Sequence, residues 1–113
     1  MPHVVIECSE NLESLLREQA VCQKAYDVLS QSGHFLAADI KTRLHPATDS
    51  YVGLKGRDGA FVHAILYLLE GRTPDVRKNL AAALLSVLRD AVPTADSVTV
   101  DISEMKREFY QKS

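Results

Sequence analysis

Apolar residues recur along this chain in two similar successions of strand, helix and strand. The short, β-branched run from His3 to Cys8 predicts a strand, and the polar stretch from Ser9 to Asn11 suits the start of a helix. Apolar residues at helical spacing then predict one helix that ends near Gly33, with a stripe formed by Leu12, Leu15, Leu16, Cys22, Tyr26 and Leu29. Alternation from Asp39 to His45 predicts a second strand with one polar face.

The second succession follows a segment, Pro46 to Gly59, whose proline and glycines predict a loop or hairpin connection. Residues 60–70 are nearly all apolar, as expected of a central strand that is covered on both faces. Thr73 suits a helix N-cap and Pro74 the first helical position, so a helix begins there and ends before Pro93. A final alternation predicts the last strand, with Val98, Val100 and Ile102 inward.

This order predicts an α/β (α+β) fold in a single domain, residues 1–113, built from two β-α-β units at about 2–46 and 60–105. Each crossover makes its two strands parallel, which gives a four-stranded sheet with two helices on one face. One helical layer covers only one face of the apolar strand at 60–70, so an oligomer that packs sheet faces together is expected. The ferredoxin-like sandwich fits this order, and so does a second fold that depends on how the chain begins.

Composition narrows the function classes. The chain has 113 residues and a net charge of −2, which gives it no overall attraction for nucleic acid or acidic membranes. No secretory signal and no membrane-length apolar run is present, so we expect a cytoplasmic protein. The two cysteines, Cys8 and Cys22, are expected as buried thiols, and the scattered histidines have no metal-ligand spacing.

Pro2 is the first candidate for chemistry. If Met1 is removed, Pro2 becomes a secondary amine at the chain terminus. Burial and neighbouring cations disfavour the ammonium form and lower its pKa, and a neutral amine near pH 7 is a competent general base. Once protonated, the same nitrogen can return a proton elsewhere along a conjugated system. A proline that merely happens to stand at position 2 is the alternative.

Three cations are candidates to accompany it. Lys41 and Arg43 share the polar face of the second strand, and Arg72 stands at a strand-to-helix junction, where helix amides also favour anions. Arginine suits bidentate contacts with carboxylates. A solvated strand face and a decorated turn are the alternative interpretations of these residues.

Three stretches carry a family resemblance: MPHVVIEC, ADIKTRLH and AFVHAILYLLEGR. Together they resemble the 5-carboxymethyl-2-hydroxymuconate isomerases of the tautomerase superfamily, from Pro2 to about Tyr110. The second half also resembles the small 4-oxalocrotonate tautomerases, which are single β-α-β units. The resemblance implies the tautomerase fold, a homotrimer, no cofactor and a catalytic Pro2 that acts as base and then acid.

The resemblance also implies arginines that bind substrate carboxylates. Arg72 matches the family's EGR junction, and Arg43 matches the second of two arginines in the family's middle strand, where Lys41 replaces the first. Lysine keeps the charge but loses the two-pronged grip, and Thr99 stands where the small tautomerases have another arginine. The expected reaction is proton transfer in an unsaturated 2-hydroxy or 2-oxo polycarboxylate, 5-carboxymethyl-2-hydroxymuconate in homoprotocatechuate breakdown. The alternatives are a different keto-enol acid, or a non-catalytic ferredoxin-like binding module.

Overall fold

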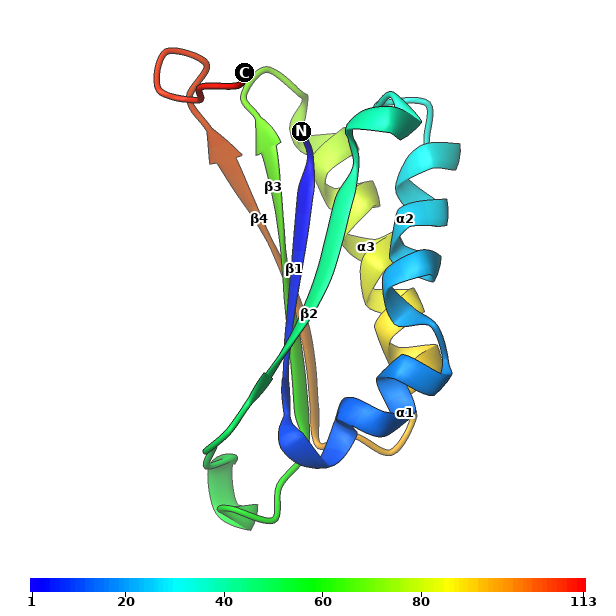
Figure 1. Cartoon of the computed structure of the whole chain (residues 1–113), viewed down its shortest axis with the longest axis vertical. Coiled ribbons are helices and arrows are strands. Elements are labelled where there is room, and N and C mark those ends of the chain that lie inside the picture. The colour runs from blue at the N-terminus through cyan, green and yellow to red at the C-terminus, as the bar shows by residue number, and fades with distance from the viewer.

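A computed structural model describes all residues 1–113 and shows one mixed four-stranded sheet with helices on one face (Figure 1). The strands are β1 (His3–Ser9), β2 (Lys41–Ala47), β3 (Phe61–Leu69) and β4 (Ser97–Met105), in the spatial order β2-β1-β3-β4. β1 and β2 are parallel, β3 and β4 are parallel, and the central pair β1 and β3 is antiparallel. Both strand-helix-strand units therefore join neighbouring strands. In the ferredoxin-like sandwich a strand separates the two strands of such a unit, so that alternative is wrong.

The helices are α1 (Glu13–Glu18), α2 (Val21–Gln31) and α3 (Pro74–Ala91), with short 3-10 turns η1 (Glu10–Leu12), η2 (Ala37–Asp39) and η3 (Gly53–Lys55). The prediction of a single helix in the first half is wrong, because the structure has two helices there. The chain breaks at Ala20, whose φ of 52° lies in the left-handed region, and this break separates α1 from α2.

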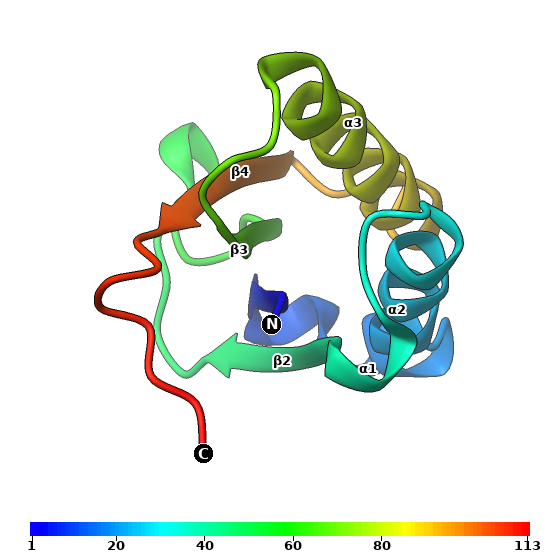
Figure 2. The ribbon, with the colours of Figure 1, turned by 90° about the horizontal axis from the view of Figure 1, so that it is seen from above.

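One face of the sheet packs against α2 and α3 to form the core, as Figure 2 shows from above. Alternate residues of β1 and β3 point into this core, and the list of fully buried strand residues includes Val4, Ile6, Val62, Leu66 and Leu68. The other residues of β3, from Phe61 to Leu69, are half-buried. Within the single chain only one face of this strand meets a helix layer, as expected, and coverage of the other face by an oligomer stays a prediction.

The start of α3 follows the predicted signals closely. The Thr73 hydroxyl accepts a hydrogen bond from the main-chain N–H of Val76 at 3.3 Å, and Pro74 occupies the first helical turn. Before them, Gly71 has a φ of +117°, which side-chain-bearing residues rarely adopt. This turn takes the chain out of β3 and sets Arg72 at the junction between strand and helix.

Candidate active site

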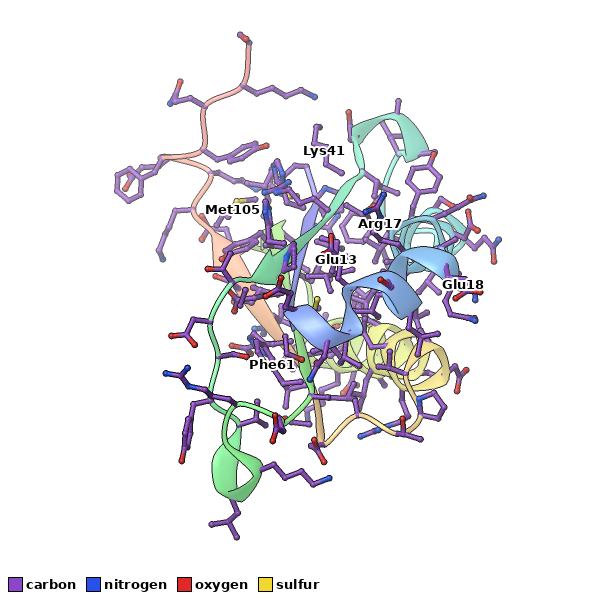
Figure 3. The ribbon with its side chains drawn as sticks, turned by 60° about the horizontal axis from the view of Figure 1, so that its bottom comes forward. Glu13, Arg17, Glu18, Lys41, Phe61 and Met105 are labelled. Atoms are coloured by element: carbon purple, nitrogen blue, oxygen red, sulfur yellow. The ribbon has the colours of Figure 1, made fainter.

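The start of the chain and Arg72 lie at the same end of the sheet, around a cavity of about 460 Å³. Met1, Phe35, Arg72, Arg107, Tyr110 and Lys112 are among the residues that line it. They come from the terminus, the segment after α2, the β3–α3 junction and the C-terminal tail. Figure 3 shows Lys41 and Met105 at this end of the sheet, with Phe61 at the other. Segments far apart in the sequence therefore build a single site.

The chain terminus is fixed by main-chain hydrogen bonds. The Lys41 N–H donates to the Pro2 carbonyl at 3.1 Å, which extends the pairing of β1 with β2 by one residue. The Met1 ammonium donates to the main-chain carbonyl of Asp39 at 3.1 Å. Pro2 itself is fully buried. The terminal residues are thus held as part of the sheet and not as a loose end.

Burial, and next the charge of Lys41, lower the pKa of the terminal ammonium from its ordinary value. The Lys41 Nζ donates to the same Asp39 carbonyl at 2.8 Å, so the lysine and the terminal nitrogen share one acceptor. Two cationic groups around one carbonyl favour loss of a proton from the weaker base. The site therefore favours an amine that is neutral nearer to physiological pH.

Arg72 is anchored so that its guanidinium borders the cavity. Its Nη2 donates to the main-chain carbonyl of His34 at 2.8 Å, and its Cζ lies 4.5 Å from the centre of the Phe35 ring. Burial, and then Arg107, lower the pKa of Arg72, but a guanidinium remains protonated. The N–H groups that these contacts leave free can bind an anion.

Positive charge dominates the cavity lining. Arg72, Arg107, Lys112 and the terminal ammonium face it, against one carboxylate, Asp39. The Asp39 Oδ1 is itself paired with the Lys112 Nζ at 3.2 Å. A ligand with more than one carboxylate is therefore complementary to this cavity.

The sequence-predicted residues are not all gathered here. Pro2 lies beneath Met1, and Arg72 lines the cavity, but Lys41 and Arg43 are not among the lining residues. Lys41 lies beside the terminal amine, whereas the Arg43 Nη1 lies 3.3 Å from the His3 Nδ1. Direct binding of a substrate carboxylate by Arg43 stays a prediction, because the Arg43 side chain here contacts His3.

Three lining residues for which the sequence predicted no role lie in the C-terminal tail: Arg107, Tyr110 and Lys112. β4 extends to Met105, and the tail beyond it returns over the end of the sheet. Its alternating charges are typical of any exposed segment, so the sequence offered no signal for this role. A run of cations separated by an aromatic residue is the nearest feature that could have suggested it.

The opposite end of the sheet holds a second cavity, of about 390 Å³, with a different lining. The polar residues that line it include Ser9, Glu10, Asn11, Asp49 and Arg57. No group of three or more His, Cys, Asp or Glu side chains lies close enough to hold a metal ion. No helix has the length and hydropathy that a membrane span needs.

Comparison with known proteins adds to this geometry. The family model of 5-carboxymethyl-2-hydroxymuconate isomerase matches residues 2–112. The Delta-isomerase of that name from Escherichia coli is 27% identical over 89 residues, which cover 79% of this chain and 71% of the relative. A structure of such an isomerase from Deinococcus radiodurans R1 superposes with a TM-score of 0.85 at 26% identity, over 99% of this chain and 88% of that one. A symmetric trimer of fused wild-type 4-OT shares the fold, with a TM-score of 0.80 at 16% identity over 98% and 91% of the two chains.

Proposed function

Because this chain belongs to the 5-carboxymethyl-2-hydroxymuconate isomerase family, and is an isomerase with the tautomerase fold, we propose that it isomerises 5-carboxymethyl-2-hydroxymuconate with a free Pro2 amine. The observation that carries the proposal is the meeting of the chain terminus and Arg72 in one cationic cavity. Homoprotocatechuate breakdown, in the cytoplasm, is the setting that this substrate implies.

Removal of Met1 turns the Pro2 nitrogen from an amide into a secondary amine. Met1 lines the cavity above the buried Pro2, so its removal enlarges the cavity and opens it to the new amine. Burial and the charge of Lys41 lower the pKa of the Met1 ammonium, and we expect the charge of Lys41 to lower the pKa of the new Pro2 amine in the same direction. The neutral fraction of the Pro2 amine near pH 7 is thereby raised.

The reaction needs one proton carrier. The Pro2 lone pair accepts the proton of the substrate's 2-hydroxyl group, and the electrons of that O–H bond move into the conjugated system to give a dienolate. The Pro2 ammonium then donates a proton to a carbon further along the system, and the double bonds shift. No atom or electron is gained or lost, so the reaction requires no cofactor.

The cations bind and polarise the substrate. Arg72 is proposed to hold one carboxylate with its free N–H groups, and Lys41 and Arg43 to stabilise charge on the β2 side. Their positive charge also favours the dienolate, in which negative charge moves along the conjugated system. Lys41 provides a compact ammonium where the family has the planar guanidinium of an arginine. This difference makes a different keto-enol acid the second candidate substrate.

The uncovered face of the sheet supports a homotrimer. Half-buried apolar side chains alternate along β3 on the side away from the helices: Phe61, Ile65, Tyr67 and Leu69. Packing of this face against other copies removes apolar surface from water, which is the main driving force of association. Analytical ultracentrifugation of the pure protein is expected to give three times the mass of the 12.5 kDa chain.

An ultraviolet assay of 5-carboxymethyl-2-hydroxymuconate isomerisation tests the proposal. The protein is untagged, and its mass shows that Met1 is absent. A matched chain with a blocked N-terminus, in which Pro2 remains an amide, is expected to lose about 10²- to 10⁴-fold in kcat, the usual contribution of a general base. Equal turnover by both chains would rule out the Pro2 amine as the proton carrier, and turnover with only a different keto-enol acid would replace the substrate.

A further inference from the structure

Three side chains are joined in series by two hydrogen bonds, and the last of them lies at the cavity. The Arg43 Nη1 lies 3.3 Å from the His3 Nδ1, and the His3 Nε2 lies 3.0 Å from the Tyr110 hydroxyl. The His3 and Tyr110 rings also meet edge to face, with centroids 6.2 Å apart. Arg43 comes from β2, His3 from β1 and Tyr110 from the C-terminal tail.

The chemistry of arginine determines which atom donates and which accepts in each of these two hydrogen bonds. A guanidinium has only N–H donors, so the His3 Nδ1 must be the acceptor and must carry no proton. A neutral imidazole then carries its proton on Nε2 and donates it to the Tyr110 oxygen. Burial, and then Arg43, lower the pKa of His3, in agreement with a neutral ring.

Tyr110 is therefore an acceptor toward His3, and its own O–H remains available. The hydroxyl has no other hydrogen-bond partner within the chain, and Tyr110 lines the same cavity as Arg72 and Met1. Hydrogen bonds in series polarise one another, so a phenol that accepts from His3 is a better donor. This free donor lies at the cavity that the cationic groups line.

We propose that Tyr110 is a substrate-binding residue that donates this hydrogen bond to an anionic oxygen of the substrate, with His3 as its positioning residue. The oxygen is a carboxylate or the dienolate oxygen, and the inference rests on the proposed function of the same site. Both oxygens are strong acceptors for a phenol, and they are distinguished by the kinetic test below.

The tail that carries Tyr110 is tied down on both sides of it. The Lys112 Nζ pairs with the Asp39 Oδ1 at 3.2 Å, and the Arg107 N–H donates to the Glu70 Oε2 at 2.9 Å. Figure 2 shows this tail running from the end of β4 toward β2, on the side of the sheet away from the helices. These ties hold the hydroxyl in place before a ligand arrives, which lowers the cost of binding.

Tyr110→Phe tests the proposal because it removes the hydroxyl and keeps the ring. We expect kcat/KM to fall about 10- to 100-fold, the range for a lost hydrogen bond to a charged group. A fall in kcat identifies the dienolate oxygen, and a rise in KM identifies a carboxylate. Tyr51→Phe is the matched control, since that exposed tyrosine lies in the loop at the opposite end of the sheet. Kinetic constants of Tyr110→Phe within twofold of the native values would overturn the proposal.

A binding experiment separates this inference from the proposed reaction. The probe is 2-oxoadipate, a 2-oxo dicarboxylate, added to protein with ¹³C-labelled tyrosine rings and observed by NMR. We expect the Tyr110 Cζ signal to shift and Tyr110→Phe to bind the probe about tenfold more weakly, even if the native chain turns over no muconate. Unchanged affinity, or no binding by the native chain, would overturn the inference.

The proton on the His3 ring provides a third readout. Nitrogen-15 NMR of the ring is expected to show Nε2 protonated and Nδ1 bare in the native protein. A proton on Nδ1 would make Tyr110 the donor toward His3, would leave no proton for the substrate, and would refute the proposal whatever the kinetics.

Discussion

The two ends of the sheet have a similar arrangement of strands but different polar groups. Because β1 and β3 are antiparallel neighbours, one end holds the start of β1 and the segment after β3, and the other holds the start of β3 and the segment after β1 (Figure 1). The first end has Arg72 and the chain terminus at its cavity, whereas the second has Glu10, Asp49 and Arg57.

The difference shows that the repeated strand-helix-strand topology does not by itself provide a basic main-chain nitrogen. At the second end the position corresponding to Pro2 is Ala60, an internal residue whose N–H donates to the Asp96 Oδ2 at 2.8 Å. An amide nitrogen has no basic lone pair, so this end has no equivalent of a terminal amine. Similar strand-helix-strand units therefore give two cavities, of which only one combines a titratable main-chain nitrogen with a surplus of cations.

Replacing the arginine at each end by alanine is expected to give the largest difference in kcat/KM. Arg72→Ala is expected to lower kcat/KM by about 100- to 1,000-fold, because one preorganised donor to the substrate's developing charge is lost. Arg57→Ala, at the other cavity, is the matched control and is expected to leave kcat/KM unchanged. Steady-state kinetics of the two variants would contradict the comparison if both lost activity to a similar extent.

The pH dependence of kcat/KM also distinguishes the two ends, with a smaller effect than the arginine variants. The proposed base is active when neutral, so kcat/KM rises with pH through the pKa of the terminal amine. Lys41 lowers the pKa of the Met1 ammonium, and we expect the same effect on the Pro2 amine, so Lys41→Gln is expected to move the acid limb of the profile to higher pH. Lys55→Gln, which removes a cation at the other end, is expected to leave the limb in place. An unshifted limb in Lys41→Gln would show that the titrating group is not this amine.

Each end also has an exposed ion pair, and here the smallest effects are expected. The hydrogen bond and charge of Lys112 lower the pKa of Asp39, and hydrogen bonds from Lys55 and from the Ala60 main-chain N–H lower the pKa of Asp96. Each depressed pKa adds stability above the unfolded pKa, and this stability is lost as the pH falls through the folded pKa. Asp39→Asn and Asp96→Asn are expected to lower the Tm slightly at pH 7 and not at about pH 2.5.

Activity separates these two variants. Asp39 is the carboxylate at the cationic cavity, so Asp39→Asn is expected to lower the KM for a polycarboxylate, and Asp96→Asn to leave the KM unchanged. Thermal unfolding at both pH values, together with the two KM values, checks this pair. A larger change in KM for Asp96→Asn would contradict the assignment of the site to one end.

The second half of the fold could be predicted more fully than the first. Thr73 and Pro74 mark the start of α3 with two independent signals, and the predicted helix was confirmed. The break at Ala20 carried no such signal, because alanine is a strong helix former and no proline or glycine stands nearby. Burial of Leu16 and Val21, on either side of Ala20, overrides the local preference there.

The candidate site was predictable only where local sequence determines position. Arg72 precedes a recognisable helix start, and its place follows from that start alone. The contact between His3 and Tyr110 joins residues 107 positions apart, and no periodicity encodes such a pairing. The orientation of Arg43 toward His3, and not into the cavity, likewise depends on the register of β1 with β2.

The interior position of β1 has a consequence for how the protein matures. β1 comes first in the chain but lies between β2 and β3, so neither neighbour exists until residues 41–47 and 61–69 have been synthesised. Throughout that interval the start of the chain is unpaired and open to a methionine aminopeptidase. Once the sheet closes, Pro2 is buried and Met1 is held by Asp39. Under the proposed mechanism, we therefore expect Met1 to be removed most readily before β1 pairs with its two neighbours.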